Sequence, residues 1–254
     1  MKKIISLLVS LIIISGDVCA AAKEKAVPIL LYHNIAVVYN SADDALNVTP
    51  ERFQEQLSSL KDAGYTIIPF QQYIEYANGN TDVPEKSVVV TFDDGYSSVY
   101  YYGFPILMRL EVPATVFVIS GLLGFNDTVY PHFTWEQAKE MDNSGYVDIQ
   151  SHSNFHYNAK EISSSRLILE LRKSKYDIET RLNKKCNILA FPYGEYDAQG
   201  LSIAKAAGFS CVARTRDWGT NRKSDGLFNL NRIFVHGSWT GKDLIAEIEK
   251  NNLM

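Results

Sequence analysis

The sequence predicts an α/β fold in which helices cover a mainly parallel sheet. Short apolar, β-branched segments alternate with amphipathic helical segments along the chain, as successive βα units do. No linker, low-complexity tract or internal repeat divides the 254 residues, so the alternation describes one domain with seven or eight such units. An open doubly wound sheet and a closed or partly closed barrel both fit this pattern.

The expected strands are short runs rich in valine, isoleucine and aromatic residues. The clearest is 88–92, VVVTF, whose nearly continuous apolar character is typical of a strand buried on both faces. The full set comprises 29–32, 65–68, 88–92, 114–119, 147–150, 188–191, 209–213 and 233–235.

The expected helices lie between these runs. The first covers 49–64, where Thr49 is placed to cap the helix, Pro50 suits its first position and Gly64 ends it. The remaining helices are expected at 97–111, 134–144, 162–183, 198–207 and 242–251.

The amino-terminal segment has the pattern of a secretory signal. Two lysines precede the apolar stretch Ile4–Ile14, and the small-residue segment SGDVCAAAK follows. We therefore expect residues 1–22 to be a signal peptide and 23–254 to be the exported domain, in the periplasm, at the cell surface or outside the cell. A buried amino-terminal helix and a lipid-modified Cys19 are the alternatives. The apolar stretch is too short to span a bilayer, and no later segment approaches that length.

The charge and the cysteine content say little about binding partners, disulfide bonds or the oligomeric state. A formal net charge of −4 gives no indication of a nucleic-acid partner. Cys186 and Cys211 remain after the signal peptide, and in an oxidising compartment they could form a disulfide. The sequence does not show whether they meet, and it gives no oligomeric state beyond the expectation of a monomer.

Polar residues follow several of the predicted strands. Asp93 and Asp94 come directly after 88–92, and His152 and His156 come after 147–150. In both open and closed parallel α/β folds, functional residues belong at the carboxyl ends of the strands.

Two histidines and one of the aspartates match a metal site. His152 and His156 are four residues apart, a spacing that on a helical turn places both rings on one face. With Asp94 they make a set of two histidines and one carboxylate, which leaves coordination positions open for chemistry. Beside a divalent cation a second carboxylate is tolerable, and Asp93 can then accept a proton from water held by the ion.

The chain resembles the polysaccharide deacetylases of carbohydrate esterase family 4, whose domain is named after the NodB chitooligosaccharide deacetylase. The resemblance rests on five motifs in order over about 145 residues: TFDDG, HSNFH, FPYG, RDW and IFVH. It implies a distorted, incomplete (β/α) barrel with seven or eight mainly parallel strands. The upstream segment VPILLYHNI is similar to the entry strand of secreted exopolysaccharide deacetylases, including those acting on poly-N-acetylglucosamine.

The resemblance also implies roles for residues at the motif positions. The implied catalytic residues are Asp93 as general base, His236 as general acid, Asp217 as the residue holding it, and Tyr193, whose backbone N–H stabilises the oxyanion. The implied ligands of one divalent ion, expected to be Zn²⁺, are Asp94, His152 and His156. The implied substrate pocket contains Trp218, Ile233, Pro192 and Gly194.

Two positions depart from the family pattern. The arginine that usually opens the third motif and pairs with the base is Ala190 here, and Arg214 stands where an acidic residue is usual. Arg214 or Arg216 could replace the missing arginine. His33 and His132 match no motif position, and we expect His33 to be structural or to contact substrate.

The predicted function is that of a secreted, metal-dependent hydrolase. It would remove N-acetyl groups from N-acetylglucosamine-type sugars in a polysaccharide or oligosaccharide, through water activated by the metal. One alternative is an O-acetyl esterase acting on a polysaccharide, and another is a non-catalytic carbohydrate-binding relative. A glycosidase is disfavoured because Asp93 and Asp94 are adjacent, whereas paired catalytic carboxyl groups lie about 5 Å or more apart.

Overall fold

The computed structural model describes residues 24–36, 45–126, 130–214 and 219–252. Its main sheet is entirely parallel and confirms the predicted α/β class. The strands are β1 (Ile29–Tyr32), β4 (Thr66–Ile67), β5 (Ser87–Phe92), β6 (Ala114–Val118), β7 (Val147–Ser151), β8 (Ile188–Ala190), β9 (Cys211–Ala213) and β10 (Ile233–Phe234). Each of the eight expected strands is present, with ends shifted by at most two residues.

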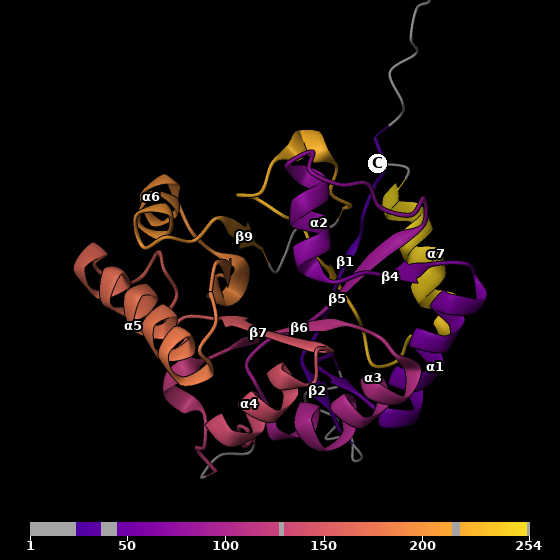
Figure 1. Cartoon of the computed structure of the whole chain (residues 1–254), viewed down its shortest axis with the longest axis horizontal. Coiled ribbons are helices and arrows are strands. Elements are labelled where there is room, and N and C mark those ends of the chain that lie inside the picture. Colours follow the sequence, from indigo (N-terminus) through magenta and orange to yellow (C-terminus); the bar gives the residue numbers. More distant parts are fainter. Residues whose placement is uncertain (1–23, 37–44, 127–129, 215–218, 253–254) are drawn as a thin grey trace, which may run out of the picture.

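The sheet curls into an incomplete barrel. Its order is β10-β1-β5-β6-β7-β8-β9, and β4 pairs with β5 outside this order. The outer strands β9 and β10 do not pair with each other, and an isolated bridge between Ala213 and Leu230 lies in the gap between them. We call this gap the seam. Figure 1 shows the curled strands at the centre of the molecule with helices around them.

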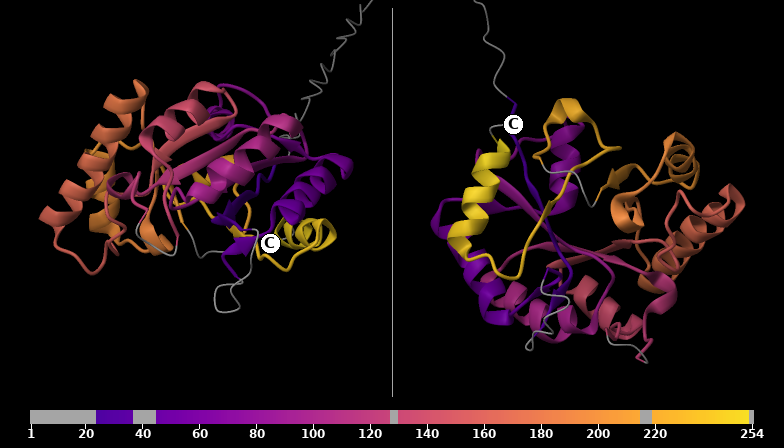
Figure 2. Two further views of the ribbon diagram at one scale, coloured as in Figure 1. Left: turned by 90° about the horizontal axis from the view of Figure 1, so that it is seen from below. Right: turned by 180° about the vertical axis from the view of Figure 1, so that it is seen from behind.

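The described residues form seven α-helices. They are α1 (Pro50–Asp62), α2 (Phe70–Ala77), α3 (Phe104–Leu110), α4 (Trp135–Asn143), α5 (Ser164–Leu182), α6 (Ala198–Ala206) and α7 (Gly241–Asn252). Of these, α2 packs against the inner side of the curled sheet and the others lie around the outside. The predicted first helix is confirmed, with the Thr49 side chain accepting a hydrogen bond from the Arg52 backbone and with Pro50 at the first position. The first and last helices, α1 and α7, pack side by side (Figure 2).

Three features were not predicted. Helix α2 has only eight residues, and its N-cap residue Pro69 provides no side-chain hydrogen bond, so the usual start signals are missing. The expected helix 97–111 divides into a π-helical turn, Val99–Gly103, and α3. A separate parallel pair, β2 (Asn34–Ile35) with β3 (Asn47–Val48), is too short to show a periodic pattern.

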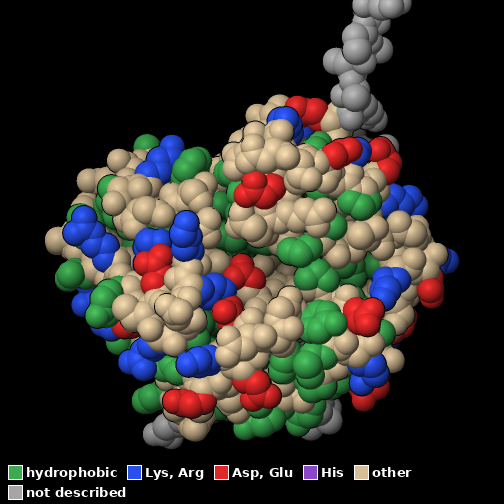
Figure 3. Space-filling view, viewed as in Figure 1, with side chains coloured by type: hydrophobic (Ala, Val, Ile, Leu, Met, Phe, Trp, Pro, Cys, Tyr) green, Lys and Arg blue, Asp and Glu red, His purple; other side chains and the backbone are tan. Residues whose placement is uncertain are grey.

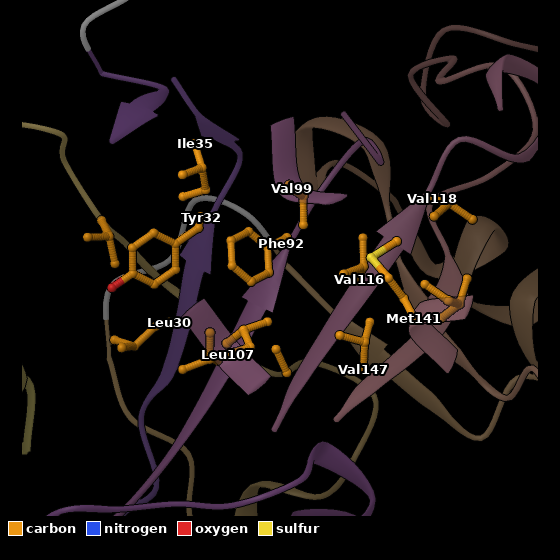
Figure 4. Packing of buried hydrophobic residues seen from close by; sticks show 14 of the residues in the cluster. Leu30, Tyr32, Ile35, Phe92, Val99, Leu107, Val116, Val118, Met141 and Val147 are labelled. Carbon is orange, nitrogen blue, oxygen red and sulfur yellow. The ribbon is translucent and has the colours of Figure 1, made fainter. Parts of the chain in front are cut away.

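The core has two layers because successive strand residues point to opposite faces of the sheet. The outer layer, between the strands and the surrounding helices, contains Leu30, Phe92 and Val116 (Figure 4). The inner layer contains Val89 and Phe117 on the strands, and apolar side chains of α2 pack against it. Helix α2 therefore closes the inside of the barrel.

A hollow of about 240 Å³ lies at the amino ends of β6 and β7. Lys184 borders it and forms ion pairs with Asp142 and Asp148. Burial alone would lower the pKa of Lys184, but the charges of Asp148 and Asp142 outweigh it and raise the pKa. This end of the barrel thus holds a partly buried ammonium with both of its acidic partners.

The predicted signal peptide, residues 1–22, lies outside the described residues. No described helix combines the length and the apolar character needed to cross a membrane. Cys186 and Cys211 are both buried free thiols, so the disulfide that the sequence left open does not form in this structure.

Candidate active site

The three residues predicted as metal ligands lie together at the carboxyl ends of the strands. Asp94 follows β5, while His152 and His156 are on the loop after β7. Asp94 Oδ1 is 3.5 Å from His152 Nε2 and 3.4 Å from His156 Nε2, and the two Nε2 atoms are 3.2 Å apart. Three potential ligand atoms therefore face one another, each from a residue with little or moderate exposure.

The donor set fits a divalent cation. Asp94 Oδ1 is buried and has no hydrogen-bond partner. His152 Nδ1 is 2.7 Å from the Ala190 carbonyl oxygen, which can only accept, so Nδ1 carries the proton and Nε2 offers its lone pair. Burial lowers the pKa of His156 to about 4, so its ring is neutral near pH 7. One carboxylate and two neutral imidazoles suit a catalytic metal site.

The loop that carries both histidines is not helical, and in this respect the predicted helical turn is wrong. Ser153 and His156 have φ values of 64° and 61°, in the left-handed region that side chains with a Cβ avoid. Two serines support the turn: the Ser151 hydroxyl accepts from the Ser153 backbone, and the Ser153 hydroxyl accepts from the His156 backbone. The two rings meet through this tight turn rather than through helical spacing.

A glycine allows a neighbouring turn to approach this loop closely. Gly121 N–H donates to the Asn154 carbonyl oxygen at 2.9 Å, and the Ser120 hydroxyl donates to the Asn154 side chain at 3.0 Å. A Cβ on Gly121 would lie 2.7 Å from the Asn154 carbonyl oxygen and equally close to the Phe155 ring. Gly121 is therefore required for this contact.

Asp93 lies beside the ligand cluster and forms a fully buried ion pair with Arg232. The two guanidinium nitrogens are each 2.7 Å from a different Asp93 oxygen. Burial alone would raise the pKa of Asp93, but the charge of Arg232 and its hydrogen bonds to the carboxylate outweigh it and hold the pKa well below its ordinary value. Asp93 is thus a carboxylate in the ionised form that a general base requires.

Arg232 takes the place of the arginine missing at Ala190. Neither replacement suggested by the sequence is seen in that role: the Arg214 guanidinium stacks on the Tyr196 ring at 5.0 Å, and Arg216 lies outside the described residues. The Arg214 carbonyl oxygen accepts a hydrogen bond from Arg232 Nε at 2.6 Å. Sequence spacing gave no signal for Arg232, because its side chain reaches Asp93 from the start of β10, outside the motifs.

His33 also belongs to the site. Strand β1 pairs with β5 so that Tyr32 lies opposite Phe92, and the backbone N–H of Asp93 donates to the Tyr32 carbonyl oxygen. This register places His33 at the level of the two aspartates. Burial lowers the pKa of His33, and the charges of Asp94 and Asp93 oppose that shift. The sequence had left His33 without a motif position.

His236 is one strand further away, after β10. Its ring contacts Phe234, with 5.1 Å between centroids, and Trp239, with 5.0 Å. Phe234 in turn lies 5.5 Å from the His33 ring, so aromatic contacts connect the two histidines. Ile233, predicted for the substrate pocket, is fully buried in the outer core layer.

The turn after β8 contributes Tyr193 to the same region. Tyr193 has φ 60° and ψ 1°, its side chain is 46% exposed, and its ring centroid lies 4.6 Å from that of His156. Pro192 is buried, and Gly194 has a φ of 66°. The predicted oxyanion residue therefore lies next to a predicted metal ligand.

An open hollow of about 400 Å³ adjoins the ligand cluster. His156 and Tyr193 border it, together with Tyr157, Asn158 and other polar residues. No histidine side chain is visible on the face shown in Figure 3. The predicted residues Asp217 and Trp218 lie outside the described residues.

One family of known proteins matches the part of the chain that contains the ligand cluster. The family model of polysaccharide deacetylases matches residues 80–212, a little over half of the chain. This range contains the ligand cluster and Asp93, while His33 and Arg232 fall outside it.

Solved structures match over most of the chain. The Streptococcus pyogenes deacetylase PplD, solved in complex with acetate, is 29% identical with a TM-score of 0.81, and the match covers 89% of this chain and 99% of that one. IcaB from Ammonifex degensii is 26% identical with a TM-score of 0.79, covering 88% and 97%. The poly-beta-1,6-N-acetyl-D-glucosamine N-deacetylase of Staphylococcus aureus (strain MRSA252) is 26% identical over 206 residues, which cover 73% of this chain and 71% of the relative.

Proposed function

The chain belongs to the polysaccharide deacetylase family, and from that premise we propose that it is a metal-dependent hydrolase that removes N-acetyl groups from amino sugars in a polysaccharide. One observation carries the proposal most directly. The convergent atoms of Asp94, His152 and His156 lie beside Asp93, a carboxylate held ionised by Arg232. This arrangement combines a cation site with a base, the two groups that hydrolysis of an amide requires.

The residues divide the chemistry between them. Asp94, His152 and His156 would hold the ion, which when bound acidifies water and polarises the acetyl carbonyl. Asp93 would accept a proton from the attacking water, and Arg232 keeps the Asp93 carboxylate oriented. The Tyr193 N–H would donate to the oxyanion that develops on the carbonyl oxygen, an interaction whose loss costs about 10²–10³-fold in rate.

Two histidines are candidates for the proton donor to the departing amine. The motif position favours His236, whereas the register of β1 and β5 favours His33, which lies level with Asp93. We propose His33 as the donor and His236 as a residue that supports its ring through Phe234. Asp217 remains the proposed residue that holds His236, and Trp218 remains a proposed part of the substrate pocket.

The substrate class follows from the relatives. The Staphylococcus aureus relative is named for poly-β-1,6-N-acetyl-D-glucosamine, so we propose a polymer of N-acetylglucosamine as substrate and a periplasmic, extracellular or surface location. Zn²⁺ is the proposed ion, because a site of histidines and a carboxylate suits it. The rival activity is O-acetyl ester hydrolysis on the same scaffold.

Acetate release tests the proposal. The purified protein would be incubated with Zn²⁺ and, separately, with β-1,6-linked N-acetylglucosamine oligomers, peptidoglycan and acetyl-xylan. We expect release from the N-acetylglucosamine oligomers and much less from acetyl-xylan. Release from acetyl-xylan alone would establish the esterase instead, and no release from any of the three would favour a non-catalytic relative.

The two histidines can be separated by changing the leaving group. An amine must be protonated as it departs, whereas an aryl oxide leaves without help. We expect His33→Ala to reduce activity on an N-acetyl substrate by about 10²-fold or more, and to affect an aryl acetate far less. His236→Ala should affect both substrates to similar, smaller extents. The reverse pattern would return the donor role to His236.

A further inference from the structure

A buried carboxylate on α5 contacts the loop that carries the two histidines. Glu170 is 2% exposed, and its Oε2 accepts a hydrogen bond from the Phe155 backbone N–H at 2.7 Å. Its other oxygen, Oε1, lies 2.9 Å from the Arg166 guanidinium. Both oxygens of this carboxylate are therefore engaged, one with the loop and one with a cation on its own helix.

The contact is made at a sensitive point of the loop. Phe155 immediately precedes His156, whose left-handed φ of 61° is unfavourable for a residue with a side chain. Such a conformation persists only where surrounding contacts hold it. A charge-assisted hydrogen bond to the adjacent peptide is one of the stronger contacts that a protein can supply.

Arg166 extends the same arrangement toward the surface. Its guanidinium carbon lies 4.9 Å from the centre of the Tyr157 ring, and Tyr157 borders the hollow beside the ligand cluster. The pair formed by Glu170 and Arg166 therefore contacts the loop on both sides of His156, through the backbone of Phe155 and through the ring of Tyr157.

The same helix supplies a natural control. Asp177 is also buried and also pairs with a cation four residues earlier, Lys173. The contacts of Asp177 stay within α5, whereas Glu170 reaches the loop. The two pairs thus share spacing, burial and helix, and differ in the contact with the histidine loop.

We propose that Glu170, paired with Arg166, is a positioning residue that fixes His156 as a metal ligand. The inference rests on the proposed function, because it assigns the ligand role to His156. Partners outside the ligand set typically change metal affinity by about 10–100-fold when they are removed. Glu170 should therefore contribute to metal affinity as well as to stability.

Two double variants of the full exported chain test this. Arg166→Met/Glu170→Met and Lys173→Met/Asp177→Met each remove a whole pair, so neither leaves an unpaired buried charge that would prevent folding. Zn²⁺ affinity would be measured by competition with a chromophoric chelator, and stability by urea unfolding of the metal-free proteins. We expect the first variant to bind Zn²⁺ about 10–100-fold more weakly and the second to stay close to wild type. Equal changes in both variants, or none in either, would overturn the proposal.

Two further measurements complete the test. Glu170→Gln keeps an oxygen that can accept from Phe155, so its affinity should lie between wild type and the double variant. In the metal-free protein the Phe155 amide should exchange with solvent faster in Arg166→Met/Glu170→Met than in the control pair. If wild type binds no Zn²⁺, the proposed metal site fails, while amide exchange still decides whether Glu170 holds the loop.

Discussion

The two ends of the barrel both contain buried or partly buried charges, and they differ in one carboxylate oxygen at the carboxyl end that is buried without a hydrogen-bond partner. At the amino ends of β6 and β7, Lys184 is paired with Asp142 and with Asp148. At the carboxyl ends, Asp94 Oδ1 is buried without a hydrogen-bond partner. A charge with its partners present stabilises the fold, whereas a buried carboxylate oxygen without one is available to bind a cation.

Backbone conformation follows the same division. Among the described non-glycine residues, six have positive φ, and four of these belong to the site: Asp94, Ser153, His156 and Tyr193. The other two end helices, where a left-handed residue is ordinary. Strain is therefore concentrated where ligand atoms must converge. Both observations identify the carboxyl end as the functional end without reference to sequence motifs.

The largest expected effect comes from Asp93→Asn. Removing the base should reduce acetate release by about 10²–10⁴-fold, and leaving Arg232 buried without its partner should lower the free energy of unfolding by about 3–5 kcal/mol. Asp93→Asn/Arg232→Met should recover stability but not activity. Acetate release and urea unfolding measure the two effects. A variant with more than a tenth of wild-type activity would show that Asp93 is not the base.

A smaller loss is expected from Arg232→Ala, and it should be partly reversible. Without Arg232, activity should fall by about 10–100-fold, as for other residues that orient a catalytic group. Ala190 lies in the same inner core layer as the ring against which Arg232 packs. Ala190→Arg/Arg232→Ala should therefore restore part of the activity by supplying the guanidinium from the usual family position. No recovery in the double variant would mean that only Arg232 can reach Asp93 productively.

The histidines at the carboxyl ends of the strands should also make the stability of the protein depend on pH in the acid range. The pKa of His156 is about 4 in the folded, metal-free protein, below its ordinary value of 6.5. Between these values the unfolded chain binds the extra proton, so stability should fall as the pH is lowered from about 6.5 to 4, by up to about 3 kcal/mol. The lowered pKa of His33 acts in the same direction. The free energy of unfolding, measured in urea across this pH range, should depend less steeply on pH in His156→Ala than in wild type. An equally steep pH dependence in both proteins would contradict the assignment.

The smallest effect on function is expected at the amino ends of the strands. Lys184→Met should lower the free energy of unfolding by about 1–3 kcal/mol, between the values for exposed and for buried ion pairs. Acetate release per folded molecule should stay unchanged, because the hollow at this end lies at the amino ends of the strands. A loss of turnover in this variant would show that the amino end also contributes to activity.

Much of this architecture could be predicted from the sequence, because strand patterns and strand ends are local properties. The run VVVTF predicted that Asp94 would lie at the carboxyl end of a buried strand. The motifs predicted that His152 and His156 would lie beside it. The tight turn at Ser153 could not be predicted, since left-handed residues there are supported by distant contacts such as the one from Glu170. Arg232 was missed for a similar reason: its partner Asp93 is 139 residues away in sequence.

The seam between β9 and β10 gives Arg232 a second consequence. Its side chain bonds to the Arg214 carbonyl oxygen beyond the end of β9 and to Asp93 at the end of β5. The contact that keeps the carboxylate ionised therefore also links the two sides of the seam. The ionised state of Asp93 and the closure of the seam between β9 and β10 depend on the same side chain. We expect heat to end turnover as the seam loosens, before the surrounding helices melt.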